Sequence, residues 1–129
     1  MTDTLKSHFL NLYSMALADS QIDTSELEAL YRIGNEKGIE KSEIDFIILN
    51  PDIIRFSFPD TLEEKISYLF DFAQIILADD KVDPNEIKTL ELFCTRFGFE
   101  ETNAAAITDF LINSAKENKP LSELLLIIN

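Results

Sequence analysis

The sequence predicts an all-α fold: a single-domain helical bundle of about seven helices, built from two related halves. Apolar residues recur at helical spacing along most of the chain, and no alternating strand pattern competes with them. Only three glycines and four prolines occur in 129 residues, which favours long helices over a turn-rich β fold. One acidic stretch also occurs twice, and each time it joins one apolar helical pattern to the next.

This repeated stretch is the feature around which the chain is organised. It reads ADSQIDTSE from Ala18 and ADDKVDPNE from Ala78, and the alignment continues without a gap to Gly38 and Gly98. Positions that correspond in this alignment are called equivalent below. Each copy is predicted to be a helix, an acidic turn and a second helix. The repeat halves are about residues 5–50 and 65–115, within one domain of residues 1–129.

In the first half, the apolar spacing predicts a helix over about residues 3–18. After the acidic turn, Asp23 is the predicted N-cap of a second helix. Glu26, three residues on, would be its reciprocal partner in a capping box. Gly38 provides the left-handed residue that ends this helix. A short third helix is expected to start near Ser42.

Residues 52–59 form the connector between the halves. Their apolar side chains, Ile53, Ile54, Phe56 and Phe58, show no helical periodicity. We expect this connector to lie on the core, with room for one helical turn.

The second half repeats the order of the first. A fourth helix is expected to open at Asp60 or Thr61. Asp83 is the predicted N-cap of the fifth helix, and Pro84 takes the first helical position, where its missing N–H costs nothing. Glu86 would complete a second capping box.

Two further helices are expected after Gly98, the first over about residues 101–116. The last runs from Leu121 to Ile128. It is apolar on all sides, because the five consecutive residues from Leu124 are all Leu or Ile. Both of its sides must therefore be covered. The helix either crosses the bundle as a clasp or pairs with a second chain, which would give a homodimer.

Composition limits the classes of partner. The formal net charge is −13 and no run of Lys or Arg occurs, so neither nucleic acid nor an anionic membrane is an expected partner. No apolar run approaches the ~20 residues of a membrane span, and the N-terminus lacks the layout of a secretion signal. We therefore expect a cytoplasmic protein with protein partners and no direct membrane insertion.

The inventory of catalytic groups is small. His8 is the only histidine and Cys94 the only cysteine, so one chain cannot build a histidine-based triad, a histidine-rich zinc set or an internal disulfide. His8 is expected to have a surface or half-buried structural role. Cys94 lies on an apolar helical face and is expected to be a buried, unreactive thiol. We expect no enzymatic activity.

The acidic turns remain as the candidate site, but they are not EF-hands. Counting from Asp79, the sixth position is Pro84 instead of glycine, and the twelfth is Leu90 instead of glutamate. Asp79 and Asp80 are expected at the C-terminal end of a helix, where the helix dipole disfavours a carboxylate. Lys81, turn amides or a cation must offset them.

The motif Ala-Asp-x-x-Val/Ile-Asp-x-x-Glu, found twice and followed by Leu and Gly, resembles the tellurite-resistance TerB family over about residues 5–115. The family's glycine after Ala-Asp is here Ser20 or Asp80. The resemblance implies an all-helical domain of two halves that binds divalent cations through an acidic surface and acts in stress-response complexes. The implied metal ligands are Asp19, Asp23, Glu26, Asp79, Asp80, Asp83 and Glu86.

Two functions therefore stay open. In the first, a non-enzymatic TerB-like domain binds a divalent cation and takes part in a stress-response, tellurite-resistance-like protein assembly. Ca²⁺ or Mg²⁺ is favoured over Zn²⁺, because carboxylates and helix-end carbonyls are oxygen ligands. In the second, the chain is a protein–protein interaction module without metal, and the acidic turns serve only as helix caps.

Overall fold

Helices account for the regular secondary structure of the described chain. The computed structural model describes residues 1–17, 24–78 and 81–128. Its helices are α1 (Asp3–Ala16), α2 (Thr24–Glu36), α3 (Lys41–Leu49), α4 (Leu62–Leu77), α5 (Pro84–Arg96), α6 (Glu101–Lys116) and α7 (Leu121–Ile128), with a 3-10 turn, η1, at Pro51–Ile53. No strand occurs in these ranges, so the predicted all-α bundle is confirmed. None of these helices has the length and apolar character needed to cross a bilayer.

The helix boundaries follow the sequence repeat. Helix α5 begins and ends at positions equivalent to the ends of α2, and α6 begins at the position equivalent to the start of α3. Gly38 and Gly98 have φ angles of 79° and 99°. The residue after each glycine donates its N–H to a carbonyl five residues earlier, at 2.8 Å in the first half and 3.1 Å in the second. Both helices therefore end in a Schellman cap, for which glycine is favoured because a Cβ is strained at positive φ.

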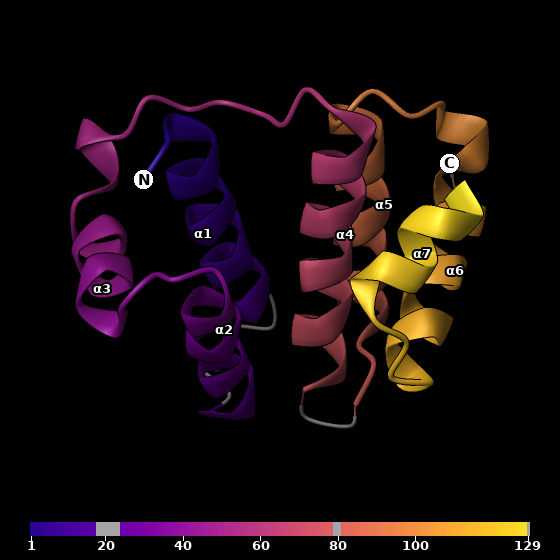
Figure 1. Ribbon diagram of the computed structural model, residues 1–129, viewed down its shortest axis with the longest axis horizontal. Coiled ribbons are helices and arrows are strands. Elements are labelled where there is room, and N and C mark those ends of the chain that lie inside the picture. The colour runs from indigo at the N-terminus through magenta and orange to yellow at the C-terminus, as the bar shows by residue number, and fades with distance from the viewer. Residues whose placement is uncertain (18–23, 79–80, 129) are drawn as a thin grey trace.

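The three helices of each half pack on one another in the same pattern. Helix α1 contacts α2 and α3, and α4 likewise contacts α5 and α6. The halves meet where α4 lies against α1 and α2. Helices α1 and α4 both run downward in Figure 1, and α2 and α5 both begin near the lower edge. The helix ends that flank the two acidic stretches therefore lie toward the same end of the molecule.

Helix α4 forms the centre of the core, since it contacts α1, α2, α5, α6 and α7. Its inward side chains, among them Leu69, Phe72 and Ile76, are fully buried. Phe72 also stacks on Phe93 of α5, with ring centroids 4.5 Å apart. Each such side chain contributes about 1.5–3 kcal/mol by leaving water. Helical spacing places Leu69 and Ile76 on the buried face of this helix, and the structure buries Phe72 as well.

The connector between the halves differs from the prediction. It contains the expected helical turn, η1, but it lies on the core only near its end, where the ring of Phe58 meets that of the core residue Phe97 with centroids 5.7 Å apart. Ile53 and Phe56 are more than half exposed. Its backbone is instead fixed along the start of α1, where the Ser57 N–H donates to Ser7 Oγ at 2.9 Å. Successive side chains of an extended segment point to opposite sides. A segment anchored in this way turns some of its apolar side chains to solvent.

Helix α7 is covered on one side only. It lies on α4 and buries Leu124 completely, while Leu126 is 82% exposed and Ile127 is 61% exposed. The prediction that both sides are covered is therefore wrong within one chain. The physical reason is that a short helix on the outside of a bundle presents only one stripe to its neighbour.

Candidate functional site

The structure describes part of the predicted metal site. Four of the predicted ligands lie outside the described residues: Asp19, Asp23, Asp79 and Asp80. The other three stand at the beginnings of α2 and α5: Glu26, Asp83 and Glu86. Within the described ranges, no three His, Cys, Asp or Glu side chains are grouped so as to hold a metal ion. The metal site therefore stays a prediction.

Asp83 is the N-cap of α5, as predicted. Its Oδ1 accepts the backbone N–H of Asn85 at 2.7 Å, and Pro84 takes the first helical position. In a capping box the bond would instead go to Glu86, the third helical residue. Asp83 binds the backbone only two residues on, as aspartate does in an Asx turn. The cap is confirmed, but its geometry is not that of a capping box.

Glu26 and Glu86 occupy equivalent positions in the two halves, and both are buried. Only 2% of Glu26 and 3% of Glu86 is exposed, whereas Glu63 in the first turn of α4 is exposed. Burying a carboxylate is unfavourable unless other groups compensate it, and both side chains have interaction partners. Helix capping does not require this burial. Within the described part of the predicted metal-ligand set, Glu26 and Glu86 are therefore the residues that capping alone does not explain.

A buried polar cluster joins the two halves at the contact between α1 and α4. His8 Nε2 lies 2.8 Å from Asp71 Oδ2. Lys37 Nζ, directly after the end of α2, lies 3.4 Å from the same oxygen. Both His8 and Asp71 are buried. Three ionisable groups are thus held together by three different helical segments.

His8 is neutral at neutral pH. Burial holds the pKa of His8 below its ordinary value of 6.5; the neighbouring Asp71 opposes this shift, and Lys37 adds to it. In the neutral ring, Nε2 carries the single N–H and donates a hydrogen bond to the Asp71 carboxylate. Nδ1 is buried and has no hydrogen-bond partner in the described part of the chain. An unprotonated nitrogen tolerates that position better than an N–H would.

The prediction of a surface or half-buried His8 is wrong. Tyr68 stacks on the imidazole with ring centroids 3.9 Å apart. Phe9 and Phe72 pack their rings edge-on against it. Aromatic side chains from both halves therefore cover this residue near the start of α1.

Sequence reasoning also missed Asp71 and Lys37. One signal was present, because Asp71 is the only charged residue between positions 66 and 77. A lone charge in such an apolar stretch indicates a buried partner. Cys94, by contrast, is buried as predicted, and burial raises the pKa of its thiol.

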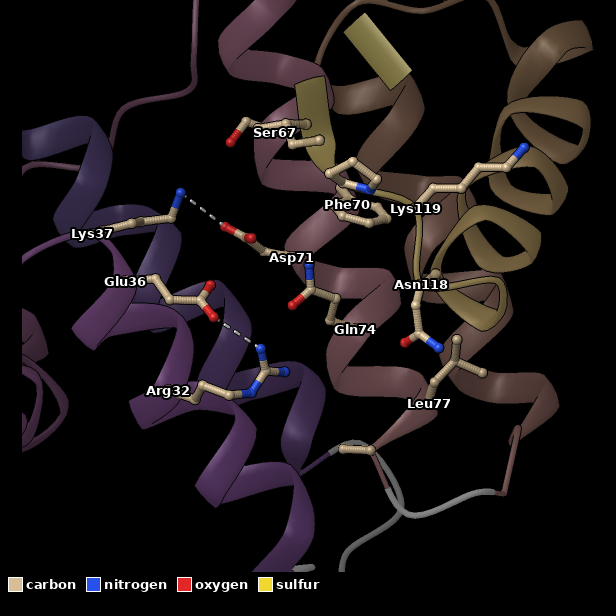
Figure 2. A pocket seen from close by; sticks show the side chains of 14 residues that line it. Arg32, Glu36, Lys37, Ser67, Phe70, Asp71, Gln74, Leu77, Asn118 and Lys119 are labelled. Atoms are coloured by element: carbon tan, nitrogen blue, oxygen red, sulfur yellow. Dashed lines mark hydrogen bonds and ion pairs between the residues drawn. The ribbon is translucent and has the colours of Figure 1, made fainter. Parts of the chain in front are cut away.

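Asp71 also lines a cavity of about 580 Å³ that lies between the two halves (Figure 2). Its size falls within the range of small-molecule sites. Helix α2, helix α4 and the turn between α6 and α7 supply its walls. Its polar lining includes Arg32, Glu36, Lys37, Asp71, Gln74 and Asn118.

Comparison of the chain with protein-family models, curated proteins and solved structures gives no significant match. The resemblance to the TerB family accordingly stays a prediction from the repeated motif.

Proposed function

We propose that this protein is a non-enzymatic acidic helical domain, similar to the TerB family, that binds a divalent cation. We further propose that it takes part in a stress-response, tellurite-resistance-like protein assembly in the cytoplasm. The observation that supports cation binding is the burial of Glu26 and Glu86 at equivalent positions of the repeat.

The surroundings of these two glutamates support the proposal further. Helices α2 and α5, which they open, both begin toward the same end of the molecule (Figure 1). Each helix also follows an acidic stretch of the sequence, which contains Asp19 in one half and Asp79 in the other. Carboxylate oxygens are the ligands that Ca²⁺ and Mg²⁺ prefer. The net charge of −13 attracts cations to the surface as a whole.

The absence of enzymatic activity is part of the same proposal. His8 is the only histidine of the chain, and none of its side chain is exposed. A general base must come within hydrogen-bond reach of its substrate. His8 is enclosed by aromatic rings and its Nε2 is engaged by Asp71, so a structural role fits it better.

Calorimetric titration with Ca²⁺, Mg²⁺, Mn²⁺ and Zn²⁺ tests cation binding. We expect Ca²⁺ or Mg²⁺ to bind, and Glu86→Gln to weaken that binding by about tenfold or more. Glu63→Gln is the matched control, because it removes the same charge from an exposed first turn. The proposal fails if none of the four cations binds, or if both variants bind as the wild type does.

Asp79→Asn tests the part of the site that only the sequence indicates. We expect it to abolish cation binding and to leave the free energy of unfolding in chelator almost unchanged or slightly higher, because it removes a carboxylate expected near a helix C-terminus. A loss of more than about 1 kcal/mol in chelator would instead mark Asp79 as a structural hydrogen-bonding residue.

A protein–protein interaction module without metal is the second candidate. Exposed apolar side chains favour it, since Phe46, Leu49, Ile53 and Phe56 are each more than half exposed, and such groups mark interaction sites when they form a patch. The acidic turns would then serve only as helix caps. The titration above separates the two candidates, because this one requires that no cation binds.

A further inference from the structure

We propose that the cavity between α2, α4 and the α6–α7 turn binds a small zwitterion of the α-amino-acid class, which carries one ammonium and one carboxylate group. This inference is independent of the cation binding proposed above, because it concerns other residues. The cavity has a volume of about 580 Å³ and lies where the two halves meet (Figure 2). Cavities at such junctions are common small-molecule sites.

Charged groups of both signs line this cavity. Arg32 and Glu36 lie one turn apart on α2, with Nη1 and Oε1 separated by 3.2 Å. Lys37 and Asp71 form the second pair, which bridges from the end of α2 to α4 at 3.4 Å. Figure 2 shows the two pairs one above the other along the space between α2 and α4. Together these four side chains carry two positive and two negative charges.

Lys119 also lines the cavity, but it stands apart from the two pairs. In Figure 2 its side chain runs away from them. Its Nζ lies 3.2 Å from an oxygen of Glu117, which does not line the cavity. The charged wall that a ligand meets is therefore the one shared by α2 and α4.

Asp71 is the most firmly held side chain of this wall, because it is buried and has two partners. Only 9% of its side chain is exposed. Its Oδ2 accepts from His8 and pairs with Lys37, while Oδ1 has no hydrogen bond within the described residues. A carboxylate held in one orientation by buried neighbours loses little further freedom when it binds a ligand.

Three of the four charged residues on this wall are not repeated in the other half of the sequence. Arg32, Lys37 and Asp71 have no charged counterpart in the other half, where the residues at the equivalent positions are Leu92, Phe97 and Asn11. A duplication by itself would place similar residues in both halves. Each of these three charged residues occurs in one copy of the repeat only, and all three line the cavity.

The electrostatics favour a ligand with both charges and no net charge. The net charge of −13 repels a simple anion, and the wall, with two charges of each sign, has no excess of negative charge to hold a simple cation. A zwitterion can use groups of both signs. Its ammonium group would lie against Asp71, and its carboxylate against Arg32, whose planar guanidinium pairs well with carboxylates. The amides of Gln74 and Asn118 add donors and acceptors.

Amide chemical-shift perturbation in the full-length protein tests this proposal. Each of the common L-amino acids is added at millimolar concentration, and acetate and methylammonium serve as probes with a single charge. We expect at least one amino acid to give saturable shifts in segments 32–37, 67–77 and 118–121. The N-acetyl and carboxamide derivatives of that amino acid should each bind at least about tenfold more weakly, because each lacks one charge.

Two variants complete the test, and a third is the control. Arg32→Gln and Asp71→Asn should each weaken binding by about tenfold or more. Arg55→Gln removes the same charge as Arg32→Gln, but from an exposed position in the connector, and should change nothing. Because the Arg32 side chain is itself 53% exposed, Arg32→Gln is informative even if Asp71→Asn does not fold.

Three results would overturn the proposal. The first is that no amino acid gives saturable shifts in these segments. The second is that acetate or methylammonium alone reproduces the shifts, which would mean a site for a single charge. The third is that the Arg32→Gln protein binds as tightly as the wild type and the Arg55→Gln control.

Discussion

His8 and Tyr68 occupy equivalent positions of the repeat and stack on each other, with ring centroids 3.9 Å apart and 8° between the ring planes. The two copies of one position therefore meet at the contact between α1 and α4. Such a meeting is expected when the axis that relates two copies passes between them. It also places the only histidine of the chain inside the core, beside Asp71, so that folding is coupled to pH.

The stability of the protein should fall as the pH is lowered through the titration range of His8. Burial holds the pKa of folded His8 below the ordinary 6.5. Below that pH the unfolded chain binds a proton that the folded protein does not. The free energy of unfolding therefore decreases until the pH has passed the lowered pKa, and this contribution is fully present above the ordinary pKa.

Urea unfolding between about pH 8 and pH 5 measures this effect. His8→Phe keeps a ring against Tyr68 but cannot titrate, so its stability should depend less on pH over that range. If the wild-type curve is no steeper than that of the variant, the coupling to His8 is wrong.

Gly34→Ala should destabilise the protein, because a Cβ at this buried position would overlap Cδ1 of Ile44, whose side chain is itself fully buried and has little room to move away. Overpacking of this kind costs about 1–3 kcal/mol, and alanine's better helix propensity returns at most about 1 kcal/mol. Ile44→Val removes the overlapping carbon, so the double variant should recover part of the loss. In the other half, the equivalent positions are Cys94 and Ala104.

Chemical denaturation of the wild type, the two single variants and the double variant forms a double-mutant cycle for this contact. A favourable coupling between the two substitutions is expected. Strict additivity of the two losses would show that Ile44 is not what excludes a side chain at Gly34.

Asp83→Ala should lower the free energy of unfolding by about 1 kcal/mol, because it removes the acceptor of the Asn85 N–H. The loss should be the same in chelator and in the presence of a divalent cation, since the cap does not depend on metal. Asp83→Asn keeps an acceptor oxygen and should cost less. Equal stability of Asp83→Ala and the wild type in urea unfolding would contradict the role of this cap.

Leu124→Ala and Leu126→Ala should differ sharply, although they are two residues apart on α7. Leu124 is fully buried, and its truncation should cost about 2–5 kcal/mol. Leu126 is largely exposed, and its truncation should change stability by less than about 0.5 kcal/mol. Urea unfolding measures both. Sedimentation of wild-type and Leu126→Glu protein shows separately whether this face pairs two chains in a homodimer.

The sequence alone determined most of the helix boundaries, although the first helix, predicted over about residues 3–18, ends at Ala16. The helix ends depend on backbone groups only a few residues from Asp83, Gly38 and Gly98. Their effect can therefore be predicted from the neighbouring sequence. The helices over 101–116 and 121–128 were predicted with the boundaries that the structure has. Of the candidate site, the role of Asp83 as a helix cap could be predicted from such local rules.

Only the tertiary structure decided which polar residues are buried and which apolar ones are not. Helical spacing defines a face, but the fate of a residue at its margin depends on the neighbour that covers it. His8 and Asp71 are buried together because α1 packs on α4, a contact between residues 63 positions apart. Leu126 is exposed because α7 turns one stripe toward α4, the stripe that contains Leu124, and Leu126 lies outside it. The cavity beside Asp71 likewise exists only where the two halves meet, since no segment contains it alone.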